Sequence, residues 1–231
     1  MMRSSDRSGW ARRRLAAGLA AAIARVLAAP APAAAAPSWG CTATPLTASL
    51  LTVPLDLAPL RANPANVPCA NHLRTIASID LAALVGLQAT VLDAETTTTA
   101  GVVPDRRVTS RAEAKDVGLS PLGYGGLLTV GAAHASVAAE CPADGSTLPV
   151  LTADSTFTDI KVLGVPVSLL NSPVNVDIGL VRVRIVPHYE ERTATSIRRV
   201  ALRVEATLLF GVAELLVADV ASATVSAVDN P

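Results

Sequence analysis

Large aromatic side chains are scarce in this sequence, whose 231 residues include two tryptophans, two tyrosines and two phenylalanines. Sites that bind sugars or nucleic-acid bases commonly use exposed aromatic rings as stacking platforms. With so few rings, scattered along the chain, the sequence argues against both kinds of stacking site.

Motifs for catalysis and for metal binding are also missing. The sequence contains no G-x-S-x-G, S-x-x-K or C-x-x-C motif and no glycine-rich phosphate loop after a strand. Its histidines, His72, His134 and His188, are far apart and lack the spacing of metal ligands. We therefore expect no enzyme activity, no metal site and no cofactor.

No segment after residue 36 has the composition of a transmembrane helix. The best candidate, Leu208–Val220, is interrupted by Glu214 and Asp219. The C-terminal residues Val228–Pro231 form neither a sorting motif nor a hydrophobic tail. We expect the mature protein to be soluble, or held at the envelope by contacts other than an anchor of its own.

The N-terminus has the composition of a secretory signal. Five arginines among the first fourteen residues oppose one acid, the apolar run Leu15–Ala29 follows, and the Pro/Ala tract Pro30–Pro37 comes next. A basic segment, a short apolar run and a small-residue exit are typical of a signal peptide. We predict a signal peptide over residues 1–36 and a secreted or cell-surface protein. Arg12-Arg13 leaves the general secretory and twin-arginine routes both open.

Loss of residues 1–36 would leave a mildly acidic chain. That segment holds six arginines and one aspartate, so 13 basic and 18 acidic residues would remain. Because clustered Lys and Arg supply most of the free energy of nucleic-acid binding, this balance argues against a nucleic-acid partner.

Alternation of apolar and polar residues dominates the rest of the chain and predicts half-buried strands. In Val108–Val117, alternation places Thr109, Arg111, Glu113 and Lys115 on one face, whereas a helix would scatter these charges. Val181–Val186 and Arg199–Glu205 alternate in the same way. Further strands are expected at Thr47–Leu57, Arg74–Asp80, Leu87–Thr97, Leu127–Ala139, Thr156–Val162, Pro166–Leu170 and Val217–Val228.

Many short strands with near-regular turns predict an all-β fold, an antiparallel β-sandwich or barrel-like structure with at most one or two short helices. The candidate helix is Leu208–Leu216. Residues 37–231 would form a β-rich extracytoplasmic domain, which could divide into two β-subdomains at about 44–145 and 146–231. Residues 74–98, 111–140 and 202–228 repeat one plan of strand, Leu-rich corner and strand.

Four segments together resemble the choice-of-anchor P family of bacterial surface proteins. They are Ala48–Pro54 leading to Pro68-Cys69, the Ala/Ser-alternating strand ending at Cys141, Asp154–Val167, and Val220–Val225. The resemblance covers about Thr44 to Val228. It implies a secreted, β-rich envelope module of unknown biochemical activity, usually tethered by a variable C-terminal anchor, which we do not expect in this chain.

Three cysteines would remain after export, Cys41, Cys69 and Cys141. An oxidising compartment favours one disulfide, and three pairings are open. We favour Cys69–Cys141, because each cysteine adjoins a turn proline at a strand end and the resembling family often has cysteines at both places. Closing this loop would contribute roughly 4 kcal/mol in the chain-entropy treatment.

Two surface features are candidates for contact with other molecules. Arg182 and Arg184 share the solvent face of one strand and form a candidate recognition face for an envelope or extracellular partner. His188, Glu190 and Glu191 cluster near a hairpin tip, where they could hold a divalent cation, although a solvated charged loop is the more common role of such residues.

Two functions fit this sequence. The first is a non-catalytic secreted or cell-surface module with a structural or binding role and an unknown ligand. The second is an extracytoplasmic carrier of an apolar, lipid-like ligand, since a β-sandwich or barrel lined by Leu and Val can enclose one.

Export can be tested directly. N-terminal sequencing of the exported protein should give a first residue between about Ala34 and Ser38, because signal peptidases cleave after small residues. Full-length protein retained in the cytoplasm would contradict the expectation.

Overall fold

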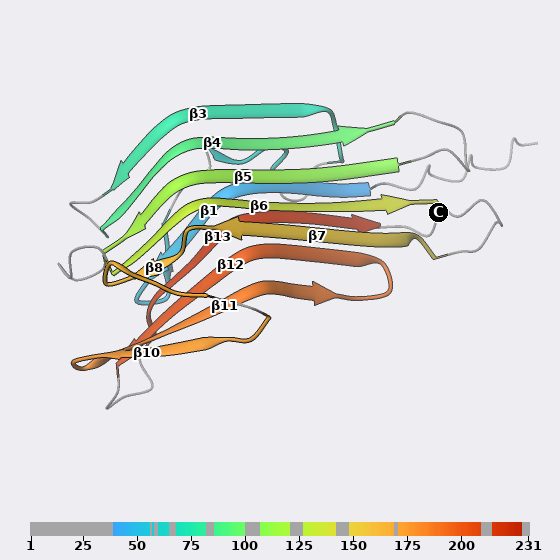
Figure 1. Cartoon of the computed structure of the whole chain (residues 1–231). Helices are drawn as coiled ribbons and strands as arrows, with labels where there is room; N and C mark the ends of the chain where they lie inside the picture. The colour runs from blue at the N-terminus through green and yellow to red at the C-terminus, as the bar shows by residue number, and fades with distance from the viewer. Residues whose placement is uncertain are drawn as a thin grey trace, which may run out of the picture. The chain divides into compact units, whose positions relative to one another are not determined.

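The computed structural model describes residues 39–55, 57, 60–64, 68–81, 86–99, 107–120, 127–141, 148–168, 171–208 and 214–227. They all belong to the second of two units into which the chain divides, residues 37–231. The predicted signal peptide, residues 1–36, lies outside the described residues. Within these ranges the chain forms thirteen strands and no α-helix (Figure 1). None of the described residues therefore belongs to a helix long and apolar enough to cross a membrane.

The strands form two antiparallel sheets. Sheet A has six strands in the order β10 (Val174–Ile178), β11 (Val181–Arg192), β12 (Ser196–Leu208), β13 (Glu214–Ala227), β1 (Trp39–Leu50) and β2 (Val53–Pro54). Sheet B has seven, with the path β3 (His72–Leu81), β4 (Leu87–Thr98), β5 (Arg107–Leu119), β6 (Leu128–Glu140), β8 (Lys161–Val162) and β9 (Val165–Pro166), while β7 (Val150–Thr158) pairs with β6.

The two sheets pack face to face, which confirms the predicted all-β fold as a β-sandwich. Strand β1 lies over β4 and β5, β13 over β5 and β6, and β12 over β6 and β7. The hydroxyl of Ser110 in β5 donates a hydrogen bond to the carbonyl of Thr42 in β1 at 2.6 Å. The first residues of β5 therefore lie against the first residues of β1. The space between them is filled by buried aliphatic side chains, among them Leu46, Leu92, Leu128, Ile185 and Leu202.

Side-chain alternation assigns the faces of the strands as predicted. Val183 is fully buried, whereas Arg182 and Arg184 on either side of it are exposed. Residues 44–145 and 146–231 share both sheets, because β1 pairs with β13 and β6 pairs with β7. The three repeated segments correspond to the hairpins β3–β4, β5–β6 and β12–β13.

Several predicted boundaries were wrong. The strand expected at Thr156–Val162 is divided, because β7 ends at Thr158 and β8 begins at Lys161. The strand expected at Pro166–Leu170 is β9, which ends at Pro166. The strand expected at Thr47–Leu57 is broken by a turn at Leu51-Thr52, and its true beginning lies at Trp39. The helix expected at Leu208–Leu216 is contradicted at both ends, because Leu208 ends β12 and Glu214 begins β13; residues 209–213 lie outside the described residues. Pairing of Leu216 with Leu50 accounts for the last error, since tertiary pairing overrides weak local preference.

Both sheets bend along one line that crosses their strands (Figure 1). In sheet B, Val91, Asp116 and Asp159 adopt positive φ; in sheet A, His188 and Ala221 do. The cross-strand pairing skips these positions. A single residue with positive φ shifts by one position the alternation of side chains between the two faces, and it bends the strand. Because these residues lie side by side in neighbouring strands, the strands bend together.

The structure corrects the predicted disulfide. Cys69 is bonded to Cys41, with 5.1 Å between the Cα atoms, and Cys141 is buried at the end of β6. After β2 the chain returns along the edge of β1, where Cys69 donates its N–H to the carbonyl of Trp39. The predicted Cys69–Cys141 pairing was therefore wrong. It was inferred in part from the prolines beside the two cysteines, which do not indicate that the chain returns to Cys41.

At the bend line, a side chain at position 131 would crowd Asp159. A Cβ atom at this position would lie 2.8 Å from Cβ of Asp159. Gly131→Ala should therefore lower the free energy of unfolding by about 1–3 kcal/mol, the usual cost of overpacking. Chemical denaturation measures the change.

Gly118→Ala is the matched control in the same sheet, since a Cβ there would meet nothing within 4 Å. It should be neutral or stabilising by roughly 0.5 kcal/mol. Equal losses in the two variants would contradict the role given to the bend.

Candidate binding groove

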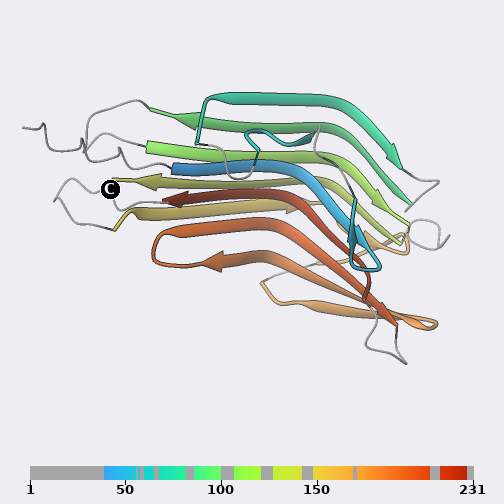
Figure 2. The ribbon, with the colours of Figure 1, turned by 180° about the vertical axis from the view of Figure 1, so that it is seen from behind.

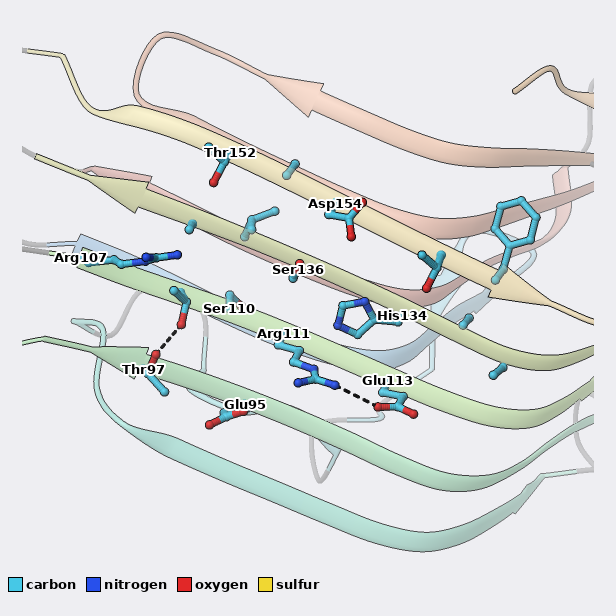
Figure 3. A pocket seen from close by; sticks show the side chains of 18 of the residues that line it. Glu95, Thr97, Arg107, Ser110, Arg111, Glu113, His134, Ser136, Thr152 and Asp154 are labelled. Atoms are coloured by element: carbon cyan, nitrogen blue, oxygen red, sulfur yellow. Dashed lines mark hydrogen bonds and ion pairs between the residues drawn. The ribbon is translucent and has the colours of Figure 1, made fainter. Parts of the chain in front are cut away.

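A groove of about 740 Å³ lies on the outer face of sheet B, over β4, β5, β6 and β7 (Figure 3). Its lining consists mainly of side chains that point away from the core. A second hollow of about 270 Å³ adjoins it and shares Glu95, Arg111 and Glu113 with it. Together they make the outer face of this sheet a candidate surface for a ligand.

The groove is assembled by the register of four neighbouring strands. Glu95, Arg111, Ser136 and Asp154 stand directly opposite one another from β4 to β7. The next row, two residues along each strand, is Asp93, Glu113, His134 and Thr156. Because side chains at alternate positions share a face, both rows project to the same side.

Carboxylates outnumber the cations available to them. Arg107 pairs with Glu140 at 3.0 Å, and Arg111 and Lys115 both pair with Glu113, at 3.5 and 3.1 Å. The side-chain carboxylates of Asp93, Glu95 and Asp154 form no hydrogen bond or ion pair with a described residue. Counted with Glu113 and Glu140, five carboxylates face three cations, which leaves a net surplus of two negative charges, and the three unpaired carboxylates line the hollows.

Hydroxyl groups and small side chains fill the rest of the surface. Thr97 and Thr109 share a hydrogen bond across β4 and β5. Small residues such as Ala132 and Ser136 line the floor, and Phe157 is the one aromatic residue in the lining. The groove therefore offers hydrogen-bond partners and negative charge, with little surface for stacking.

His134 stands in the middle of the groove. Its Nε2 atom is buried and has no hydrogen-bond partner among the described residues. Partial burial of the ring and then the positive charge of Arg111 lower the pKa of His134, whereas Glu113 and Asp154 raise it. The net effect keeps the imidazole neutral at pH 7, where it can accept or donate a hydrogen bond.

The candidate recognition pair Arg182 and Arg184 lies on the outer face of sheet A. Arg182 donates to Asp177 at 2.7 and 3.1 Å, and Arg184 lies 3.3 Å from Glu205. Both side chains are about half exposed. Their role in recognition stays a prediction, and each arginine already has an anionic partner.

His188, Glu190 and Glu191 do not converge. The Nδ1 atom of His188 lies 2.8 Å from the hydroxyl of Ser155, and its ring packs against Phe157. Glu190 binds Arg199, whereas Glu191 binds Arg198 and the hydroxyl of Tyr189. Within the part of the chain that the structure describes, no three His, Cys, Asp or Glu side chains are placed to hold a metal ion.

The Ser155–His188 contact has a structural role. Ser155 is only 5% exposed, and its oxygen also accepts a hydrogen bond from Nε of Arg199 at 2.9 Å. Burial and then the charge of Arg199 lower the pKa of His188, against a smaller opposing effect of Asp154. The contact ties β7 in sheet B to β11 and β12 in sheet A.

Sequence reasoning placed Arg111 and Glu113 on one exposed face but did not identify a groove. The contributing residues are spread over four strands, and only the register brings them together. A comparison with models of protein families, with curated proteins and with solved structures found no significant match.

The pKa of His134 reports the electrostatics of the groove. Arg111→Gln should raise this pKa, because the variant removes a positive charge that opposes protonation. Arg107→Gln is the matched control, since Arg107 is not among the groups that shift His134, and it should leave the pKa unchanged. Titration of the ring protons by NMR measures both. A rise in the second variant equal to that in the first would contradict the assignment.

The lowered pKa also affects stability. Below about pH 6.5 the unfolded chain binds a proton at His134 more readily than the folded chain, so stability should fall as the pH drops from 6.5 through the folded-state pKa. His134→Gln should show a smaller loss than the parent between pH 7.5 and 5.5 in denaturation experiments, the remainder coming from His188 and other groups.

Proposed function

We propose that the chain is a non-catalytic, extracytoplasmic binding module, secreted or at the cell surface, which holds a cationic and extended ligand on the outer face of sheet B. The observation that carries this proposal is the surplus of carboxylates in the groove. Asp93, Glu95 and Asp154 have no cationic partner among the described residues. A ligand bearing amines or guanidinium groups would supply the missing partners.

A comparison of the two outer faces supports this choice. On sheet A the carboxylates of Asp177, Glu191, Glu205 and Asp219 each lie within 4 Å of an arginine. On sheet B the cations are bound to Glu113 and Glu140, and the other acids are left over. The same chain thus pairs these four carboxylates of sheet A with arginines and leaves anions unpaired in the groove of sheet B.

The shape of the groove favours an extended ligand. The rows of polar side chains cross four strands, which are spaced about 4.8 Å apart. The rows therefore run for roughly 14 Å, the length of about four residues of extended peptide. Since aromatic platforms are nearly missing from the lining, a peptide-like or polyamine ligand suits the surface better than a sugar.

The carrier of an apolar ligand is less well supported. The inner faces of the sandwich are occupied by buried Leu, Ile, Val and Ala side chains, and the larger groove lies on the outer face among charged residues. We also propose, from the sequence resemblance, that the module is related to the choice-of-anchor P proteins.

Fluorescence anisotropy with labelled oligolysine tests the proposal. The parent should bind oligolysine and not oligoglutamate, and added salt should weaken binding. Glu95→Gln and Asp154→Asn should each weaken it about threefold and together about tenfold, since exposed ion pairs contribute about 0.5–1 kcal/mol each.

Glu214→Gln is the control, because it removes an exposed carboxylate at the other end of the strands, outside the groove. Its affinity should match that of the parent. Equal binding by all variants would show that the charge of the whole molecule, and not the groove, attracts the probe, and would overturn the proposal.

A further inference from the structure

Three tight hairpin turns at one end of the sandwich each present a leucine to solvent. The turns are Leu51-Thr52 between β1 and β2, Leu163-Gly164 between β8 and β9, and Gly179-Leu180 between β10 and β11. They lie at the same end of the strands, at the left in Figure 1 and at the right in the view from behind in Figure 2. Their leucines are 57, 51 and 58% exposed in that order.

The backbone of two of these turns is unsuited to leucine. Both central residues have positive φ in each case, at 49° and 67° for Leu51-Thr52 and at 49° and 77° for Leu163-Gly164. Hairpin turns of this kind favour Asn-Gly, and bulky residues rarely adopt positive φ. Leucine is thus unfavourable there both in its conformation and in its exposure. Local strain of this kind often marks a functional surface.

The two strained turns share a sequence pattern. Leu51-Thr52-Val53-Pro54 and Leu163-Gly164-Val165-Pro166 both read L-x-V-P, although they belong to different sheets. Val53 and Val165 are 63 and 64% exposed, so each hairpin offers two aliphatic side chains. The strands that follow are two residues long and end on proline, which discourages the addition of a further strand from a partner.

The tips carry no charge and are widely separated. Residues 50–55, 162–167 and 178–181 contain no ionisable side chain. In sheet A the β1–β2 and β10–β11 turns are four strand spacings apart, roughly 19 Å at about 4.8 Å each. A protein partner would need a separate pocket for each tip, whereas a bilayer accepts separated aliphatic groups anywhere on its plane.

We propose that these three hairpin tips dock the protein on a lipid bilayer by inserting Leu51, Leu163 and Leu180, with Val53 and Val165, into its interfacial region. Insertion removes aliphatic surface from water, and the uncharged tips bring no ion into the acyl boundary. The surface is independent of the groove. The connections of residues 82–85, 121–126 and 209–213 lie outside the described residues and are not part of the proposed surface.

Flotation with phosphatidylcholine vesicles tests the proposal on the exported protein, its N-terminus verified by sequencing. The parent should float with the vesicles, and added phosphatidylglycerol or salt should change binding little, because the tips are uncharged. Combined Leu51→Asn, Leu163→Asn and Leu180→Asn should reduce partitioning by about 30-fold or more, since three aliphatic side chains are replaced by polar ones.

Stability separates loss of docking from loss of folding. Asparagine tolerates positive φ better than leucine, so the variants at positions 51 and 163 should melt no lower than the parent. Leu73→Asn is the matched control: Leu73 is 66% exposed but lies near the opposite end of the strands, in β3. It should leave flotation unchanged.

Three results would overturn the proposal. The first is a parent that does not float, and the second is a triple variant that floats as well as the parent. The third is self-association of the parent that the triple variant loses, seen by sedimentation velocity without vesicle binding, because the tips would then join two copies of the chain.

Discussion

Hydrogen-bonded register is the constraint on which the rest of this structure depends. Because each strand is paired along its length with its neighbours, no strand can change direction alone, and the bend must cross a whole sheet. The sequence meets this requirement with positive φ at Val91, Asp116 and Asp159 in sheet B and with a glycine at position 131, where Asp159 leaves no room for a side chain. Since the two sheets pack face to face, sheet A has to follow the same bend, and His188 and Ala221 adopt positive φ there.

The same register distributes the charges. On the outer face of sheet A, Arg184, Glu205, Arg203, Asp219, Arg198 and Glu191 form a continuous series of ion pairs across β11, β12 and β13. Burial raises the pKa of Asp219, and the guanidinium groups of Arg198 and Arg203 act against that rise. A buried carboxylate without such partners would be strongly destabilising. The charged side chains of this face are therefore needed for folding stability. Sheet B has no comparable network around Glu95 and Asp154. The difference between the faces is what makes the groove a candidate for binding.

Alternation in the sequence was sufficient to predict the all-β class and the faces of strands such as Val181–Val186. It was insufficient wherever the pairing of distant segments decides the local conformation. The turn at Leu51-Thr52 carries none of the residues that usually mark a hairpin, and the segment around Leu208–Leu216 has a spacing that fits either a helix or strands. The Cys41–Cys69 bridge depends on the return of the chain along β1, which no local pattern encodes. The groove is built from alternate residues of four strands, and each strand by itself resembles an ordinary solvated face.

The groove and the hairpin tips occupy different parts of the same sheets, and the bend lies between them. The groove extends from Arg107, at the start of β5, to Ala132 and Thr158 beside the bend. The tips lie beyond the far ends of these strands. From Arg111 to Leu119 alone the distance along β5 is roughly 27 Å at about 3.4 Å per residue. If the tips rest on a bilayer, the strands extend from its surface into the aqueous phase, and the groove on the outer face of sheet B faces water. A cationic ligand could then reach Glu95 and Asp154 without competing with lipid headgroups, so the two proposed surfaces are compatible in one molecule although neither depends on the other.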